Sequence, residues 1–175
     1  MEHDAAVDDR RYLAIYLRDH FAGSSAGLSL VKRCRAANLG TPWEPLLTEL
    51  ESEISADRRA LEEMMRRLSI APSAVKSILG SAADLVGRMK TNGHLAGYSP
   101  LSRLLELELL AAGVFTKRNL WRSLREVVDD HDELRSDELD ELIRGATSQL
   151  ERILDGHRTA ALVALAASAR EPAAA

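Results

Sequence analysis

The stretch that decides the fold is NLGTPWEPLLTELESEISADRRALEEMMRRLS, residues 38–69. Gly40 is typical of the residue that follows a helix, and Thr41-Pro42, with Glu44 three residues after the threonine, is typical of a helix start. Apolar residues then recur at alternating steps of three and four, the spacing of one helix face: Leu47, Leu50, Ile54, Leu61, Met64 and Leu68. This stretch predicts an antiparallel hairpin of two helices that meet at Gly40.

The same start and stop signals recur on both sides of this hairpin. They predict four long amphipathic helices, over about 9–38, 42–69, 100–128 and 137–168. Leu and Ala make nearly a third of the 175 residues, and aromatic residues make only 4%. This balance favours helices over sheets, because sheets are richer in β-branched and aromatic side chains. We therefore expect an all-α protein, a four-helix bundle.

The second and third helices are separated by a long connection, residues 70–99. Antiparallel helices are usually joined by about 2 to 8 residues, whereas this connection is long enough to travel back along helices of about 40 Å. We expect helices two and three to run parallel, joined by a crossover that contains a short helix over 73–89. The whole chain, 1–175, is expected to form a single domain with a frayed tail over 170–175.

Composition excludes several classes of function. The formal net charge of -4 argues against nucleic-acid binding, which needs an excess of Lys and Arg. The apolar run over 160–167 is too short to span a membrane, and the acidic N-terminus carries no apolar signal stretch, so we expect a cytoplasmic protein. Cys34 is the single cysteine, which excludes an intramolecular disulfide and a thiolate-rich metal site.

Two stretches contain residues, such as glycine and Ser-Pro, that the apolar spacing of a helix alone does not require. They are YLRDHFAGSSAGLSL (Tyr16–Leu30) and GRMKTNGHLAGYSPLSRLLELE (Gly87–Glu108), with Leu120-Trp121 further on. Together they resemble a group of uncharacterised helical proteins of about this length encoded by actinobacteria, which implies a helical bundle and no known activity. In architecture, two hairpins joined by one crossover also resemble the ferritin-like superfamily. Members of that superfamily with a di-iron centre carry Glu-x-x-His pairs, and this chain has none.

Each long helix places one ionisable residue on its predicted inward stripe. In chain order these residues are His20, Asp57, Glu108 and His157. For the third helix that stripe is predicted as Leu101, Leu105, Glu108, Ala112, Phe115 and Asn119. Counting from the hairpin turns puts His20 level with Asp57, and Glu108 level with His157, so that each hairpin can hold one carboxylate–imidazole pair. A histidine held as an imidazolium in such a pair has a raised pKa.

Two interpretations of this buried polar cluster stay open. Paired charges can fix the register of the helices without any chemistry, in a protein of unknown function that acts as a non-catalytic structural or interaction module, without a cofactor. Such a module can form a homodimer or bind an unidentified protein. Alternatively, imidazole nitrogen and carboxylate oxygen suit iron, manganese or zinc in a metal-binding or redox protein, with Glu53 and Gln149 as further ligands. No catalytic residue is identified.

A run of six small residues, Ala22-Gly23-Ser24-Ser25-Ala26-Gly27, lies in the middle of the first helix. Each glycine there costs the helix about 1 kcal/mol relative to alanine, so something must offset the cost. One interpretation is the close approach of a neighbouring helix, in which case a larger residue at Gly23 or Gly27 would overpack the contact. The other is a cavity one turn from His20 that admits a ligand.

Overall fold

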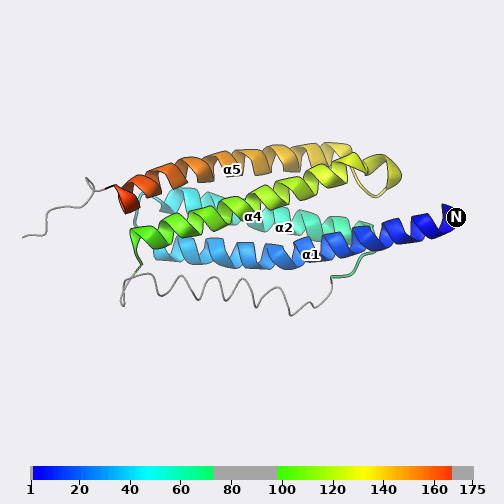
Figure 1. Ribbon diagram of the computed structural model, residues 1–175, viewed down its shortest axis with the longest axis horizontal. Helices are drawn as coiled ribbons and strands as arrows, with labels where there is room; N and C mark the ends of the chain where they lie inside the picture. Colours follow the sequence, from blue (N-terminus) through cyan, green and yellow to red (C-terminus); the bar gives the residue numbers. More distant parts are fainter. Residues whose placement is uncertain (1, 73–97, 167–175) are drawn as a thin grey trace, which may run out of the picture.

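The computed structural model describes residues 2–72 and 98–166, with side chains described from residue 10 onward. Within these residues the chain is helical and has no strand. The elements are α1 (Glu2–Ala37), α2 (Glu44–Arg67), α4 (Pro100–Glu126), the 3-10 turn η1 (Val128–Asp130) and α5 (Ser136–Leu165). Figure 1 shows the long helices side by side in an elongated bundle, which confirms the predicted all-α class with four helices. The predicted short helix over 73–89 and the tail over 170–175 lie outside the described residues.

The turn between α1 and α2 is fixed by local sequence. Gly40 has a φ of +71°, in the left-handed region that favours glycine. Thr41 Oγ1 accepts a hydrogen bond from the Trp43 backbone N at 3.3 Å, and Glu44 Oε2 accepts one from the Gly40 backbone N at 2.7 Å. The helix α2 begins at Glu44, two residues later than the sequence predicts.

Contacts between helices define their directions. Arg67 at the end of α2 pairs with Glu138 near the start of α5 at 2.6 Å. Arg152, farther along α5, pairs with Glu49 near the start of α2 at 3.0 Å, so α2 and α5 are antiparallel. Because α4 and α5 are also antiparallel, α2 and α4 run in the same direction (Figure 1). The connection between α2 and α4 lies largely outside the described residues.

Each long helix packs against two neighbours, in the order α1, α2, α5, α4 around the bundle. The largest fully buried side chains come from all four helices: Leu17, Val31, Leu47, Leu50, Met64, Met65, Leu107, Leu120, Trp121, Leu124, Leu139 and Ile153. The predicted inward stripe of α2 is buried along its whole length, from Leu47 to Leu68, with Asp57 included. The spacing of apolar residues therefore predicted the buried face of α2 correctly.

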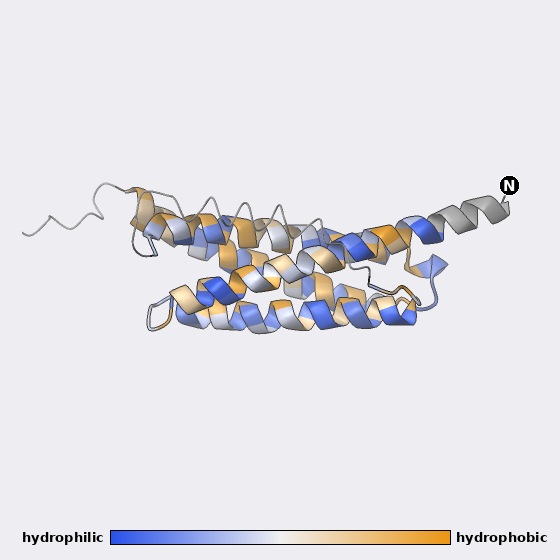
Figure 2. Cartoon of the chain, turned by 90° about the horizontal axis from the view of Figure 1, so that it is seen from below, coloured by the Kyte–Doolittle hydropathy of each residue, from blue (hydrophilic) through white to orange (hydrophobic). Residues whose placement is uncertain are grey.

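Hydrophilic and hydrophobic residues alternate along the helices, as Figure 2 shows in blue and orange. This pattern gives each helix a charged side as well as a side that contributes to the core. Of the helices that the structure describes, none has a stretch long and apolar enough to cross a bilayer.

The inward face of α4 differs from the predicted one. The residues of the predicted stripe are half-buried or exposed: Leu101, Leu105, Glu108, Ala112, Phe115 and Asn119. The buried residues are instead Leu104, Glu106, Leu107, Leu110, Val114, Leu120, Trp121 and Leu124. Six leucines within residues 101–110 surround the first turns of α4, so apolar spacing alone does not select a face there. The correct face turns Glu108 outward and Glu106 inward.

Candidate functional site

Four glycines of the described helices would place an added Cβ in open space, and three of them line one cavity, while Gly145 of α5 faces outward. A Cβ added at Gly23 or Gly27 of α1, or at Gly113 of α4, would meet no atom of the described residues within 4 Å. By contrast, a Cβ at Gly156 of α5 would lie 3.1 Å from Leu46 Cδ2, as expected where helices pack closely. No helix of the described residues therefore approaches the glycines of α1 closely, and a cavity lies beside them in that part of the chain.

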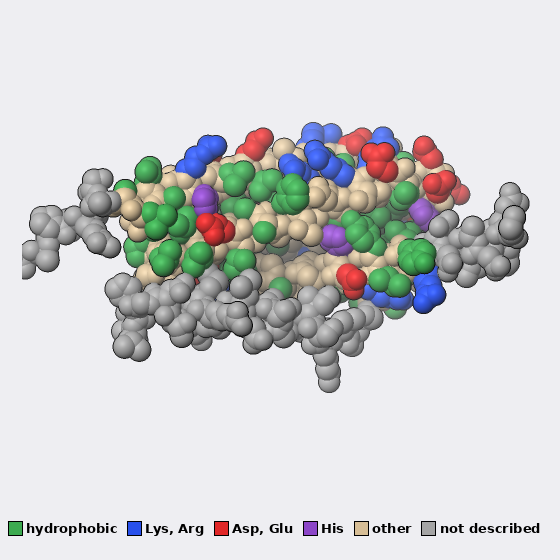
Figure 3. All heavy atoms as spheres, in the orientation of Figure 1, with side chains coloured by type: hydrophobic (Ala, Val, Ile, Leu, Met, Phe, Trp, Pro, Cys, Tyr) green, Lys and Arg blue, Asp and Glu red, His purple; other side chains and the backbone are tan. Residues whose placement is uncertain are grey.

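This cavity lies between α1, α2 and α4 and has a volume of about 600 Å³. Its apolar walls are formed by Leu30, Ile54, Leu61, Leu110, Val114, Leu120 and Trp121. In Figure 3 the strip between α4 and α1 is largely tan, the colour of backbone and small polar side chains. Small-molecule sites typically have volumes of about 300–1,000 Å³ and mostly apolar walls with a few polar groups. The cavity fits that description.

A larger hollow of about 1300 Å³ lies at the end of the bundle, where α1 meets η1 and the turn after it. Its lining includes the exposed carboxylates of Asp129, Asp130 and Asp132. Exposed carboxylates are strongly hydrated, so this hollow is a poor match for an apolar molecule. The cavity lined by three long helices, with its mostly apolar walls, is the better candidate site.

Arg58 of α2 reaches across the cavity wall to α1. Its Nη1 donates hydrogen bonds to the Phe21 backbone O at 2.8 Å and to Ser24 Oγ. The guanidinium also lies over the Phe21 ring, 3.9 Å from the ring centroid, a cation–π contact. These contacts fix the position and the plane of the Arg58 head group.

His20 lies in the same cavity lining and is half-buried. Its ring packs edge-on against the Tyr16 ring, with 4.6 Å between the centroids. Burial lowers the pKa of His20, although the nearby Asp19 acts to raise it. The predicted imidazolium with a raised pKa is thus wrong for His20, because no hydrogen bond or ion pair joins it to Asp57 among the described residues.

A pH dependence follows from His20. The pKa of His20 is lower in the folded protein than its unfolded value near about 6.5. As the pH falls from about 7 to about 5, the unfolded chain therefore binds more protons than the native state, and the native state loses stability. We expect the denaturation midpoint of the wild type to fall more steeply between about pH 7 and pH 5 than that of His20→Gln. Urea unfolding at several pH values measures both slopes. Identical slopes would contradict a depressed His20 pKa.

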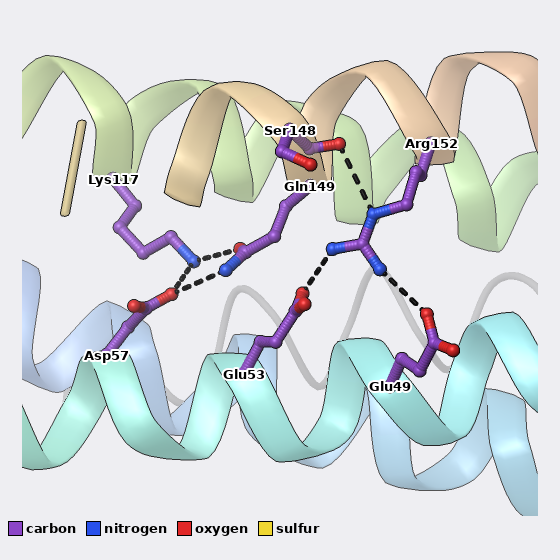
Figure 4. Close-up of polar contacts among 7 residues, drawn as sticks. All are labelled: Glu49, Glu53, Asp57, Lys117, Ser148, Gln149 and Arg152. Atoms are coloured by element: carbon purple, nitrogen blue, oxygen red, sulfur yellow. Dashed lines mark hydrogen bonds and ion pairs between the residues drawn. The ribbon is translucent and has the colours of Figure 1, made fainter. Parts of the chain in front are cut away.

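Asp57 is buried and held by two side chains from other helices (Figure 4). Lys117 Nζ of α4 donates to Asp57 Oδ2 and, at 2.5 Å, to Gln149 Oε1. Gln149 Nε2 of α5 donates to Asp57 Oδ2 at 3.0 Å. Burial lowers the pKa of Lys117, although Asp57 acts to raise it. Sequence reasoning named Gln149 as a further metal ligand but missed Lys117, which is not on the predicted inward face of α4.

Glu53 lies one turn before Asp57 and faces Arg152 of α5. Arg152 Nη2 donates to Glu53 Oε2 at 2.5 Å, and Arg152 Nη1 donates to Glu49 Oε2 at 3.0 Å (Figure 4). The carboxylate that sequence reasoning offered as a further metal ligand is therefore paired with a guanidinium of the chain itself.

Glu108 and His157 do meet, as their level positions predict. Glu108 Oε1 and His157 Nε2 are 3.1 Å apart. The pair lies at the surface, however, with 51% of the Glu108 side chain and 30% of the His157 side chain exposed. The inward placement of Glu108 was wrong because α4 presents a different face to the core.

The four predicted residues thus do not form one group. Asp57 is bound to Lys117 and Gln149, while Glu108 pairs with His157 at the surface. Across residues 10–72 and 98–166, no three His, Cys, Asp or Glu side chains gather in a way that could hold a metal ion.

A second buried carboxylate, Glu106, was missed by sequence reasoning. It accepts hydrogen bonds from Arg33 Nε at 3.0 Å, Cys34 Sγ at 3.1 Å and the Tyr98 hydroxyl at 2.8 Å. Burial and the Glu106 carboxylate raise the pKa of the Cys34 thiol, and burial raises that of Tyr98, so both remain protonated donors. Asn38 extends the cluster with a bond to the Tyr98 hydroxyl at 3.0 Å. These contacts tie the end of α1 to the start of α4.

Comparisons of this chain with protein-family models, with curated proteins and with solved structures find no match. Function is therefore inferred from the geometry and charge of the cavity.

Proposed function

We propose that this chain is a non-catalytic binding module of ferritin-like architecture, whose cavity between α1, α2 and α4 takes a small, largely apolar molecule. The observation that carries the proposal is the cavity of about 600 Å³ whose α1 wall contains the half-buried Gly23 and Gly27, neither of which meets another described helix. Each glycine costs its helix about 1 kcal/mol, and the described helices gain no contact in return. A molecule that fills the cavity would supply those contacts through burial of apolar surface and dispersion.

The ferritin-like part of the proposal is supported by the directions of the helices. In such bundles two antiparallel hairpins are joined by one long crossover, which makes the second and third long helices parallel. The α1–α2 and α4–α5 pairs are antiparallel here, while α2 and α4 run in the same direction (Figure 1).

The non-catalytic part is supported by the groups around the cavity. The Ser24 hydroxyl donates to the Phe21 backbone O at 2.6 Å and accepts from Arg58, so neighbouring groups already hold it. Cys34 lies outside the cavity lining, and its raised pKa disfavours the nucleophilic thiolate. The metal-binding alternative has no comparable support, since Lys117 and Arg152 face the carboxylates of Asp57 and Glu53.

A neutral fluorescent dye, phenylnaphthylamine, tests the proposal together with a pair of matched variants. Gly27→Leu places a leucine in the cavity, whereas Gly145→Leu places one on the exposed side of α5, which contributes nothing to the cavity lining. We expect the wild type and Gly145→Leu to bind the dye alike, and Gly27→Leu to bind at least about tenfold more weakly.

Two results would overturn this proposal. One is a wild type that does not bind the dye, measured by fluorescence titration. The other is equal affinity in Gly27→Leu and Gly145→Leu, which would place the dye outside the cavity. Far-ultraviolet circular dichroism of each variant confirms that the helices are intact.

A further inference from the structure

The cavity wall contains one arginine, Arg58, that has no carboxylate partner in the part of the chain that the structure describes. Lys117 lines the cavity too, but its ammonium group is paired with Asp57. Arg58 forms no ion pair with any residue that the structure describes, and its contacts are to the Phe21 backbone O, the Phe21 ring and Ser24. Asp19, the other acidic residue of the lining, is exposed. Among the described residues of the wall, no carboxylate therefore forms an ion pair with Arg58.

The guanidinium of Arg58 is oriented for a second partner. Only its Nη1 is used in the bonds to α1, so the edge formed by Nε and Nη2 makes no hydrogen bond to the described residues. That edge presents two parallel N–H groups, the geometry that a carboxylate accepts in a bidentate pair. Stacking on the Phe21 ring holds the plane of the edge in place.

The apolar walls determine which type of molecule can bind favourably next to Nε and Nη2 of Arg58. A neutral apolar molecule would cover Nε and Nη2 of Arg58 and leave them without acceptors, which costs about 1–3 kcal/mol per buried donor. An anionic group would instead pair with the guanidinium, and the low polarity of the walls would strengthen that pairing. The lining thus favours a molecule with an apolar body and one anionic group.

The cavity is long enough for such a body. Its lining on α1 runs from Tyr16 to Leu30, which at the helical rise of 1.5 Å per residue is about 20 Å. Arg58 meets α1 at Phe21 and Ser24, between these ends. Apolar surface therefore extends from the guanidinium along the glycines of α1.

On the basis of the proposed function, we infer that the molecule bound in this cavity is an organic acid with an apolar body, whose anionic oxygens accept hydrogen bonds from Arg58 Nε and Nη2. Its body lies against Gly23, Gly27 and Gly113.

Two dyes with the same aromatic body test this inference. Phenylnaphthylamine is neutral, and anilinonaphthalene sulfonate adds one sulfonate, whose oxygens can meet the guanidinium edge as a carboxylate would. We expect the wild type to bind the sulfonate dye at least about tenfold more tightly than the neutral dye, as for one charge-assisted bidentate contact. Arg58→Gln should abolish this preference by weakening the binding of the sulfonate dye, and it should not weaken the binding of the neutral dye, because it removes guanidinium donors that the neutral dye leaves without acceptors. Arg59→Gln, which removes an exposed arginine from the same helix, should keep the preference.

The outcomes separate the two proposals. If the wild type binds both dyes equally, or if Arg58→Gln keeps the preference, the organic-acid inference is wrong while the cavity still binds an apolar molecule. If neither dye binds, both proposals fail. Should Arg58→Gln not fold, the wild type alone decides: a preference for the sulfonate dye well below about tenfold would overturn the inference.

Discussion

Replacing Lys117 with methionine should lower the free energy of unfolding by about 3–5 kcal/mol at neutral pH, the typical cost of breaking a buried ion pair by removing one partner. Only 16% of the Lys117 side chain and 12% of the Asp57 side chain are exposed. The variant leaves the Asp57 carboxylate with the Gln149 amide as its remaining partner. Domains of this size are stable by only about 5–15 kcal/mol, so the loss is large.

Urea unfolding of the wild type and of Lys117→Met at neutral pH, monitored by circular dichroism, measures the loss of stability. A loss well below about 3 kcal/mol would contradict the expected cost of leaving a buried charge without its partner.

Removing both charges should restore most of the stability. In Lys117→Met combined with Asp57→Leu no uncompensated charge remains, and such replacements are typically neutral or stabilising. Arg152→Met is the matched control, because its ion pairs to Glu49 and Glu53 are far more exposed, and its expected cost is about 0–1 kcal/mol. If Lys117→Met costs no more than Arg152→Met, then the Lys117–Asp57 pair is not buried as described.

The difference between α2 and α4 shows when the spacing of apolar residues can predict the buried face of a helix. In α2 the apolar residues lie on one side and charged residues fill the others, so a single stripe from Leu47 to Leu68 satisfies the pattern, and all of it is buried. In α4 leucines occur on every side of the first three turns, and several stripes satisfy it equally well. Packing against α1 and α5 then selects the face, and this long-range information is not contained in local spacing.

The candidate site was predictable only in part, for related reasons. Sequence alone shows that Gly23 and Gly27 are costly, but whether a helix or a cavity lies opposite depends on how far α1 and α4 are held apart. Lys117 lies on the same helical stripe as the buried Leu110, Val114 and Trp121. A prediction based on that stripe would have placed the Lys117 ammonium group next to the buried Asp57. A lone carboxylate on an apolar seam is itself a signal that an inward-facing Lys or Arg lies nearby.

Replacing Glu106 with alanine should lower the free energy of unfolding by about 2–4 kcal/mol, since it removes a buried carboxylate and the acceptor of several hydrogen bonds. The Glu106 side chain is only 6% exposed. The thiol of Cys34 and the hydroxyl of Tyr98 both lose their acceptor, and both are held within the protein. Arg33 is 35% exposed and can turn to water, which limits the cost.

Glu108→Ala is the matched control, because it truncates the same kind of side chain two residues away on the same helix. Half of that side chain is exposed and its partner is a surface histidine, so the expected change is within about 0.5 kcal/mol. Urea unfolding of the two variants side by side measures the difference directly. A larger loss in Glu108→Ala than in Glu106→Ala would mean that α4 turns its other face to the core. Lys117 would then no longer face Asp57, and other residues of α4 would line the cavity.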